Sequence, residues 1–140
     1  MIDAALPCPC GSGLAYFRCC GRWHAGLVAP DAPTLMRSRY SGFALGLADY
    51  LLQTWHPDSR PTSIEFPPDL YWLGLEIRAS EQTDADHATV EFVARSKRAG
   101  RAMRLHEISR FVRVDGQWLY LDGSLHKPVP LPGRQPKRKA

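Results

Sequence analysis

Four cysteines lie within the first twenty residues, and the chain has no other cysteine. They are Cys8, Cys10, Cys19 and Cys20, in the spacing C-x-C-x8-C-C. Four thiolate sulfurs are the ligand set of a closed, tetrahedral structural zinc site. The spacing therefore predicts one structural zinc ion per chain. Iron is a second candidate metal, since thiolate sites also accept it.

Disulfide bonds are the alternative chemistry for these thiols. A bond within either close pair would be strained, because a disulfide needs Cα atoms about 4.4–6.8 Å apart and a fixed torsion. Crossed bonds between the two pairs stay open as an alternative. Residues 1–7 show no basic region and no long apolar region of a secretory signal. We therefore expect a cytoplasmic protein, whose thiols stay reduced and favour metal.

The residues between and after the cysteines suit a metal-binding knuckle. Gly11 and Gly13 can take positive φ, which lets the chain turn closely round an ion. Arg18 and Arg22 can offset the negative charge that four thiolates leave on a zinc ion. His24 is an alternative ligand, although a surface histidine is the simpler interpretation of that position.

The stretch from Cys8 to Cys20 reads C-P-C-G-S-G-x-x-Y-x-x-C-C. It resembles the SEC-C motif, the metal-binding module at the C-terminus of the SecA translocation ATPase. The resemblance covers residues 7–20 without a gap and implies Cys20 as the fourth ligand. Leu14 and Ala15 depart from the motif, which is usually more basic at these two positions.

Four further segments resemble the bacterial YchJ family. They are residues 35–41 (LMRSRYS), 54–57 (TWHP), 105–111 (LHEISRF) and 116–123 (GQWLYLDG). The resemblance covers nearly all of residues 5–126. It implies an α+β domain of the nuclear-transport-factor-two-like, or cystatin-like, fold behind a SEC-C knuckle, and it implies no particular reaction.

The 140 residues are enough for one hydrophobic core. We expect a SEC-C knuckle at residues 1–24, a linker at 25–33, an α+β domain at 34–126 and a basic tail at 127–140. If the core lies within the α+β domain, Cys10→Ser should unfold the knuckle and leave that domain folded. No run approaches the ~20 apolar residues that span a bilayer, so we expect no membrane partner.

The net charge of +4 comes from the C-terminal tail. Residues 127–140 contain no acidic residue, and their five basic side chains leave a net charge of −1 for the rest of the chain. We expect this tail to be disordered and solvated. It could add weak, nonspecific contact with nucleic acid, which salt would screen.

Apolar periodicity predicts helices first and strands later. Met36, Tyr40, Phe43, Leu47 and Leu51 share one helical face. We expect a helix from residue 34, a break near residue 46 and a second helix over residues 48–55, with a brief helix over 67–72 and a short strand over 62–66. Strands are expected over 74–81, 88–97, 102–114 and 117–124. The fold class is therefore α+β, with helices packed on a curved antiparallel sheet.

Turn lengths predict which side chains face the helices. A two-residue turn at Asp115-Gly116 sets Phe111 opposite Tyr120 and Ser109 opposite Asp122. A turn at residues 98–101 sets Phe92 opposite Glu107. The face expected to meet the helices carries Val90, Phe92, Ala94, Leu105, Glu107, Ser109, Phe111, Trp118, Tyr120 and Asp122. The other face holds more ionisable groups and is expected to be solvated or a dimer surface.

Two carboxylates on this apolar face need an explanation, because burying an unpartnered carboxylate is costly. Arg37, Arg39 and Tyr40 on the first long helix are natural partners. Either a buried ion pair fixes this helix on the sheet, or the polar groups line a cone-shaped pocket. The candidate pocket residues are Arg37, Tyr40, Trp55, Glu107, Ser109, Tyr120 and Asp122. The spacing selects no reaction and no catalytic residue.

Two classes of function follow. In the first, the zinc-held knuckle docks on a protein or ribosomal surface, by analogy with SEC-C knuckles in SecA. In the second, the protein is a small-molecule binder or an enzyme that uses a pocket between the first long helix and the sheet. A pocket lined by paired, inaccessible charges would support the first class. An open pocket holding an unpaired Glu107 or Asp122 would favour the second.

Overall fold

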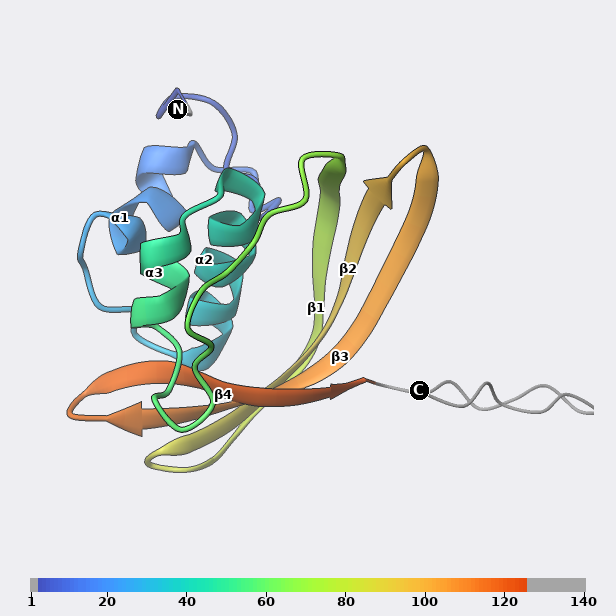
Figure 1. Cartoon of the computed structure of the whole chain (residues 1–140). Helices are drawn as coiled ribbons and strands as arrows, with labels where there is room; N and C mark the ends of the chain where they lie inside the picture. The colour runs from blue at the N-terminus through green and yellow to red at the C-terminus, as the bar shows by residue number, and fades with distance from the viewer. Residues whose placement is uncertain (1–2, 126–140) are drawn as a thin grey trace, which may run out of the picture.

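In the computed structural model of this chain, three α-helices lie on one side of a curved, four-stranded antiparallel sheet (Figure 1). The structure describes residues 3–125, so the expected basic tail lies outside the described residues. The strand order is β1-β2-β3-β4. This arrangement confirms the α+β prediction of helices on an antiparallel sheet. None of the helices within residues 3–125 is long and apolar enough to cross a membrane.

The N-terminal segment forms short helices before the long one. They are the 3-10 helix η1 (Tyr16–Arg18) and α1 (Cys20–His24), followed by α2 (Ala32–Leu45) and α3 (Ala48–Gln53). Asp31 caps α2 by accepting a hydrogen bond from the Thr34 amide at 2.9 Å. Gly46 ends α2 in the left-handed region, with φ +71°. The predicted helix break is therefore confirmed, whereas α3 is shorter than expected.

The strands are β1 (Leu70–Asp84), β2 (His87–Arg98), β3 (Arg101–Val114) and β4 (Gln117–Leu125). Two-residue turns at Ala99-Gly100 and Asp115-Gly116 join the last three, and all four turn residues have positive φ. Such turns match the natural twist of a hairpin. The expected four-residue turn at 98–101 is therefore wrong, because Arg98 and Arg101 still pair and the turn has two residues. β1 starts at Leu70, where it pairs with Arg98, so the expected helix over 67–72 is wrong. No strand forms over 62–66 either.

The register between β2 and β3 is as predicted. In the β3–β4 hairpin, the register next to the turn is also as predicted. Phe92 pairs with Glu107, and Phe111 pairs with Tyr120. A periodicity of two along each strand then places these side chains on the face that meets the helices.

One residue before Phe111 on β3, farther from the turn, the predicted register fails. The ladder shifts between Arg110 and Phe111, so Arg110 pairs with Asp122 and Ser109 pairs with Gly123. The predicted pairing of Ser109 with Asp122 is therefore wrong. An extra residue in one strand moves the following side chains to the other face of the sheet. Asp122 consequently does not join Ser109 beneath the helices.

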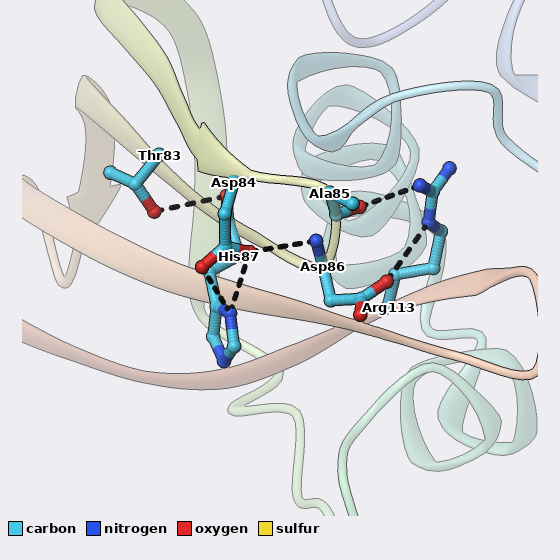
Figure 2. Close-up of polar contacts among 6 residues, drawn as sticks. All are labelled: Thr83, Asp84, Ala85, Asp86, His87 and Arg113. Atoms are coloured by element: carbon cyan, nitrogen blue, oxygen red, sulfur yellow. Dashed lines mark hydrogen bonds and ion pairs between the residues drawn. The ribbon is translucent and has the colours of Figure 1, made fainter.

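Polar contacts hold the turn between β1 and β2 (Figure 2). The Asp84 carboxylate accepts hydrogen bonds from the Asp86 amide at 2.8 Å and from His87 Nδ1 at 2.9 Å. Arg113 on β3 reaches across to donate to the carbonyl of Ala85 at 2.6 Å. These contacts hold the end of the β1–β2 hairpin against β3.

A single apolar cluster runs from the cysteines through α2 to the sheet. Cys10, Leu35, Val90, Phe111 and Trp118 all belong to it, and each is at least nine-tenths buried. The knuckle therefore shares its core with the α+β domain. The N-terminal segment in Figure 1 lies against the helices, consistent with this shared core.

Candidate metal centre and neighbouring cavity

The four cysteine sulfurs meet at one point. All four Sγ atoms lie within 4.8 Å of one another, and all four side chains are buried. The Sγ atoms of Cys10 and Cys19 are 3.5 Å apart, and none of the four cysteines forms a disulfide bond. Zn–S bonds of ~2.3 Å in a tetrahedron place sulfurs about 3.8 Å apart. The donor set therefore fits a tetrahedral thiolate metal.

The backbone of residues 7–15 forms a tight loop around the first two sulfurs. The Cys8 amide donates to the carbonyl of Leu14 at 2.9 Å, and the Gly11 amide donates to the carbonyl of Cys8 at 3.1 Å. Gly11 and Gly13 have φ of +80° and +87°, a conformation that other residues adopt at a cost. The glycines thus allow the close turn that the sequence predicted. Cys20 comes from the start of α1.

Two serine hydroxyls contact the sulfurs from outside the set of ligands. Ser12 Oγ donates to Cys19 Sγ at 3.1 Å, and Ser41 Oγ on α2 donates to Cys20 Sγ at 3.2 Å. Ser41 Oγ also lies 3.5 Å from Cys8 Sγ. Such hydrogen bonds stabilise the thiolate form and orient metal ligands. Sequence reasoning missed Ser41, because 21 residues separate it from Cys20 and no local motif marks it.

The thiols also interact strongly with one another. Hydrogen bonds from Cys10 and Cys20 lower the pKa of Cys8, while hydrogen bonds with Cys10 and Cys8 raise the pKa of Cys20. Metal ligation requires thiolates, so a divalent cation that binds this cluster releases the protons of the thiols.

His24 is neither a ligand nor a surface residue. Its Nε2 donates to the carbonyl of Ser38 at 2.8 Å, so its Nδ1 accepts from the Tyr16 hydroxyl at 2.5 Å. Its ring meets the Tyr50 ring edge-on, with centroids 4.6 Å apart. Burial lowers the pKa of His24. The imidazole therefore joins the knuckle to α2 and α3.

Some of the arginines predicted to lie near the knuckle or in the pocket occupy other places than expected. Arg37 Nη1 donates to the carbonyl of Cys10 at 3.2 Å, so Arg37 belongs to the metal centre and its assignment to the pocket is wrong. Arg22 Nε donates to the carbonyl of Cys19 at 3.1 Å. Arg18 lies over the exposed ring of Phe17. These side chains bring positive charge to the side of the cysteine cluster.

A cavity of about 290 Å³ lies between α2 and the sheet. Of the residues predicted to line a pocket, Tyr40, Trp55, Glu107, Ser109 and Tyr120 do so. Its other walls are Met36, Arg39, Phe43, Trp72, Phe92, Ala94 and Leu105. Most of these walls are apolar or aromatic, which is typical of small-molecule sites.

Glu107 brings a carboxylate to this cavity without an arginine partner. Its Oε2 accepts hydrogen bonds from Ser109 Oγ at 3.0 Å and from the Tyr120 hydroxyl at 3.4 Å. Within residues 3–125, Glu107 forms no ion pair, so the expected buried pair with an α2 arginine is wrong. The side chain lies directly over Gly123, where a Cβ would be 2.8 Å from Glu107 Cδ.

Arg39, which was considered only as a partner for the carboxylates, is the buried cation of the cavity. It is 3% exposed. Its Nη1 donates to the carbonyl of Leu51 at 2.8 Å and to Thr54 Oγ1 at 2.6 Å. Its guanidinium lies 4.9 Å from the ring of Trp55 and 4.7 Å from that of Tyr120. Burial lowers the pKa of Arg39 to about 10, so it is cationic at neutral pH.

Asp122 lies on the outer face, and its assignment to the pocket is wrong. Arg110 Nε donates to its carboxylate at 2.6 Å. This hydrogen bond holds the pKa of Asp122 below its usual value. On the same face, His106 Nε2 lies 2.7 Å from the Glu91 carboxylate. The outer face is therefore rich in paired charges, as its composition predicted.

Comparison with known proteins places both parts of the chain. The family description "YchJ, middle NTF2-like domain" matches residues 31–123, and the SEC-C motif matches residues 6–22. A UPF0225 protein of Bordetella pertussis is 62% identical over 122 residues, covering 84% of this chain and 92% of that protein. One from Methylibium petroleiphilum is 63% identical over 129 residues, covering 90% and 93%.

Two solved structures are similar to the whole arrangement. The solution structure of a SEC-C motif containing protein from Rhodopseudomonas palustris has a TM-score of 0.76 at 32% identity, covering 85% of this chain and 98% of that one. The crystal structure of one from Psychrobacter arcticus has a TM-score of 0.76 at 29% identity, covering 93% and 88%.

Proposed function

The chain belongs to the YchJ family of SEC-C motif proteins, and on this premise we propose that its four cysteines hold one structural zinc ion. The close set of four buried sulfurs is the observation that supports the proposal. Four protein ligands close the coordination shell and leave no position for a substrate. The ion would thus cross-link η1, α1 and the loop of residues 7–15. Thiolates that bind metal imply a reducing compartment, and we place the protein in the cytoplasm.

Native mass spectrometry of the full chain, purified without chelator, tests the metal. One zinc per chain is expected, and replacing any one cysteine by serine should abolish stoichiometric binding. If iron is bound instead, the metal is not zinc, but the four cysteines still form a metal centre. A metal-free chain lighter by about four protons would mean two disulfides and would overturn the proposal.

We propose further that the metal-held knuckle docks on a protein. Leu6, Leu14 and Phe17 are 52%, 49% and 52% exposed, and they come from the loop and 3-10 helix that the cysteines close. Exposed apolar side chains of this size are typical of interaction sites. The exposed Arg18 lies over the ring of Phe17, and the exposed Arg22 follows four residues later in the chain. The fitting partner is therefore a protein surface that combines apolar groups with carboxylates.

A photo-crosslinking amino acid at position 17, introduced into the full chain in cells, tests docking. The matched control carries it at Tyr71, which is 63% exposed and lies on β1. We expect one protein to cross-link at position 17 and not at 71, and Cys10→Ser to remove that cross-link. That protein, once purified, should bind the wild type and bind Phe17→Ser more weakly. Cross-links to ribosomal RNA, or equal yields at both positions, would contradict a protein partner.

A second candidate function is binding of a small molecule in the cavity. The observation that favours it is Glu107, which lines the cavity without a cationic partner among the described residues. The apolar walls and the few polar groups resemble those of ligand pockets. The cavity-lining residues that the structure describes include no paired nucleophile and base of the kind used in nucleophilic catalysis, so we propose binding and assign no reaction.

A further inference from the structure

The cavity carries a buried positive charge, Arg39, that forms no ion pair within residues 3–125. Of the five N–H groups of Arg39, those on Nη1 bond to Leu51 and Thr54. Nε and Nη2 have no acceptor within residues 3–125, and no carboxylate there pairs with this guanidinium. A buried charge without a counter-charge is costly. An anion that entered the cavity would remove this cost.

A second donor on the same wall also lacks an acceptor. The indole Nε1 of Trp55 is buried and has no hydrogen-bond partner among the residues described. Trp55 packs beside Arg39, 4.9 Å from ring to guanidinium. An unpaired donor therefore lies beside the guanidinium, so this part of the structure has more donors than acceptors.

Glu107 brings a negative charge and an acceptor to the same cavity. Glu107 Oε2 takes both hydrogen bonds of its carboxylate, from Ser109 and Tyr120. Oε1 has no hydrogen-bond partner within residues 3–125. It can therefore accept a hydrogen bond from the hydroxyl or amino group of a ligand.

Tyr120 contacts both groups. The guanidinium of Arg39 lies over its ring, 4.7 Å from the centroid, and its hydroxyl donates to Glu107 Oε2 at 3.4 Å. The cation therefore lies at the ring face of Tyr120 and the carboxylate at its hydroxyl. A ligand that carries an anionic group and a hydrogen-bond donor on different positions of a single ring can contact both.

The walls between the two ends favour a flat ligand. The aromatic side chains that line the cavity are Tyr40, Phe43, Trp55, Trp72, Phe92 and Tyr120. Ring faces and edges stabilise planar, conjugated molecules. A volume of about 290 Å³ is at the lower end of small-molecule pockets, which suits a single ring.

We infer that the cavity binds a small planar carboxylic acid with a hydroxyl or amino group at its far end. Arg39 binds the carboxylate, and Glu107 accepts the hydrogen bond of the far group. This inference rests on the second candidate function, the binding of a small molecule in the cavity. It adds the chemical class of the ligand and the residue that recognises each end.

Calorimetry on the zinc-loaded full chain tests the ligand class with three matched probes. 4-Hydroxybenzoate carries both groups, benzoate lacks the hydroxyl, and 4-hydroxybenzamide lacks the charge. We expect 4-hydroxybenzoate to bind at least ten times more tightly than the amide, because only the acid neutralises Arg39. It should also bind several times more tightly than benzoate, through Glu107.

Three variants assign the two ends of the ligand and its location. Arg39→Met should weaken 4-hydroxybenzoate at least tenfold and make the acid and the amide equivalent. Glu107→Ala should abolish the preference for 4-hydroxybenzoate over benzoate. Ala94→Leu, which adds carbons to the cavity wall and leaves every charge in place, should weaken all three probes. If Arg39→Met does not fold, the comparison of acid and amide on the wild type and on Ala94→Leu decides the question.

The outcomes separate the inference from the function on which it rests. Equal affinity for the acid and the amide on the wild type, or unchanged binding in a folded Arg39→Met, overturns the carboxylic acid. If phenol or 4-hydroxybenzylamine then binds and Ala94→Leu blocks it, the small-molecule function still stands. If no probe of either set binds at millimolar concentration, or Ala94→Leu leaves binding unchanged, both the inference and the function of this cavity fail.

Discussion

The hydroxyl of Ser41 on α2 donates a hydrogen bond to Cys20 Sγ, 3.2 Å away, and both side chains are almost fully buried. The α+β domain thus supplies part of the environment of the metal centre. The cysteines in turn form part of the core that α2 shares with the sheet. The knuckle and the sheet domain are therefore expected to stabilise each other.

Replacing Ser41 by alanine should weaken metal binding. The hydroxyl that orients Cys20 and lies near Cys8 would be lost, while the ligands stay in place. Loss of such a supporting hydrogen bond typically reduces metal affinity about 10–100-fold. Competition with a chromophoric zinc chelator measures the change. Ser124→Ala on β4, where the serine is exposed, is the matched control. An affinity equal to that of the control would show that the hydroxyl does not support the metal.

Cys10→Ser should destabilise the whole described fold. The expectation from sequence was that only the knuckle would unfold, but Cys10 is fully buried in a cluster that also contains Leu35 and Trp118. Loss of a structural metal from a shared core is among the changes that cost about 4 kcal/mol or more. Thermal unfolding followed by the near-ultraviolet dichroism of the tryptophans measures it. If the sheet melts at the wild-type temperature, the knuckle is an independent unit after all.

Gly123→Ala should destabilise the protein through Glu107. A Cβ at position 123 would overlap the Glu107 carboxylate, lying 2.8 Å from its Cδ. Overpacking of this kind costs about 1–3 kcal/mol. In a Glu107→Ala background the same substitution should cost less than about 0.5 kcal/mol, because the opposing atoms are gone. Chemical unfolding of the four proteins completes the cycle. Equal costs in both backgrounds would mean that the strain arises elsewhere.

His24 should make the folded state less stable in mild acid. Burial lowers its pKa, so below about pH 6.5 the unfolded chain binds a proton that the folded chain resists. The stability that neutral His24 contributes is therefore fully present above the pKa of the unfolded chain. It falls as the pH drops below that value towards the lower pKa of the folded chain.

His24→Gln isolates this contribution. At pH 7.5 the variant should be less stable by about 1–3 kcal/mol, because the longer, flexible amide does not hold its acceptor and donor where the rigid imidazole holds Nδ1 and Nε2, and one hydrogen bond, to Tyr16 or to Ser38, is left unmade. The gap between the wild type and the variant should narrow as the pH falls to 5.5. Melting temperatures across this range measure the gap, with zinc in excess so that the metal stays bound. A gap independent of pH would show that His24 titrates normally in the folded protein.

Much of the fold and all four cysteines of the metal centre could be predicted, because their signals are local. The cysteines lie within thirteen consecutive residues, and glycines at positions 11 and 13 fix how closely the loop turns. The hairpin turn at Asp115-Gly116 and the helix break at Gly46 are also encoded by the conformational freedom of the residues at those positions. Each depends on a few neighbours in the chain, so sequence alone was sufficient.

The tertiary structure decided which charges enter the cavity. Arg37 and Arg39 are two residues apart on α2, so their side chains point about 200° apart, one to the metal centre and one to the cavity. Likewise, a single irregularity after Arg110 turns Asp122 outward and leaves Glu107 alone. The sequence determined the types of side chain available. Long-range packing of α2 on the sheet, and a register shift that no turn residue signals, decided where each of them lies.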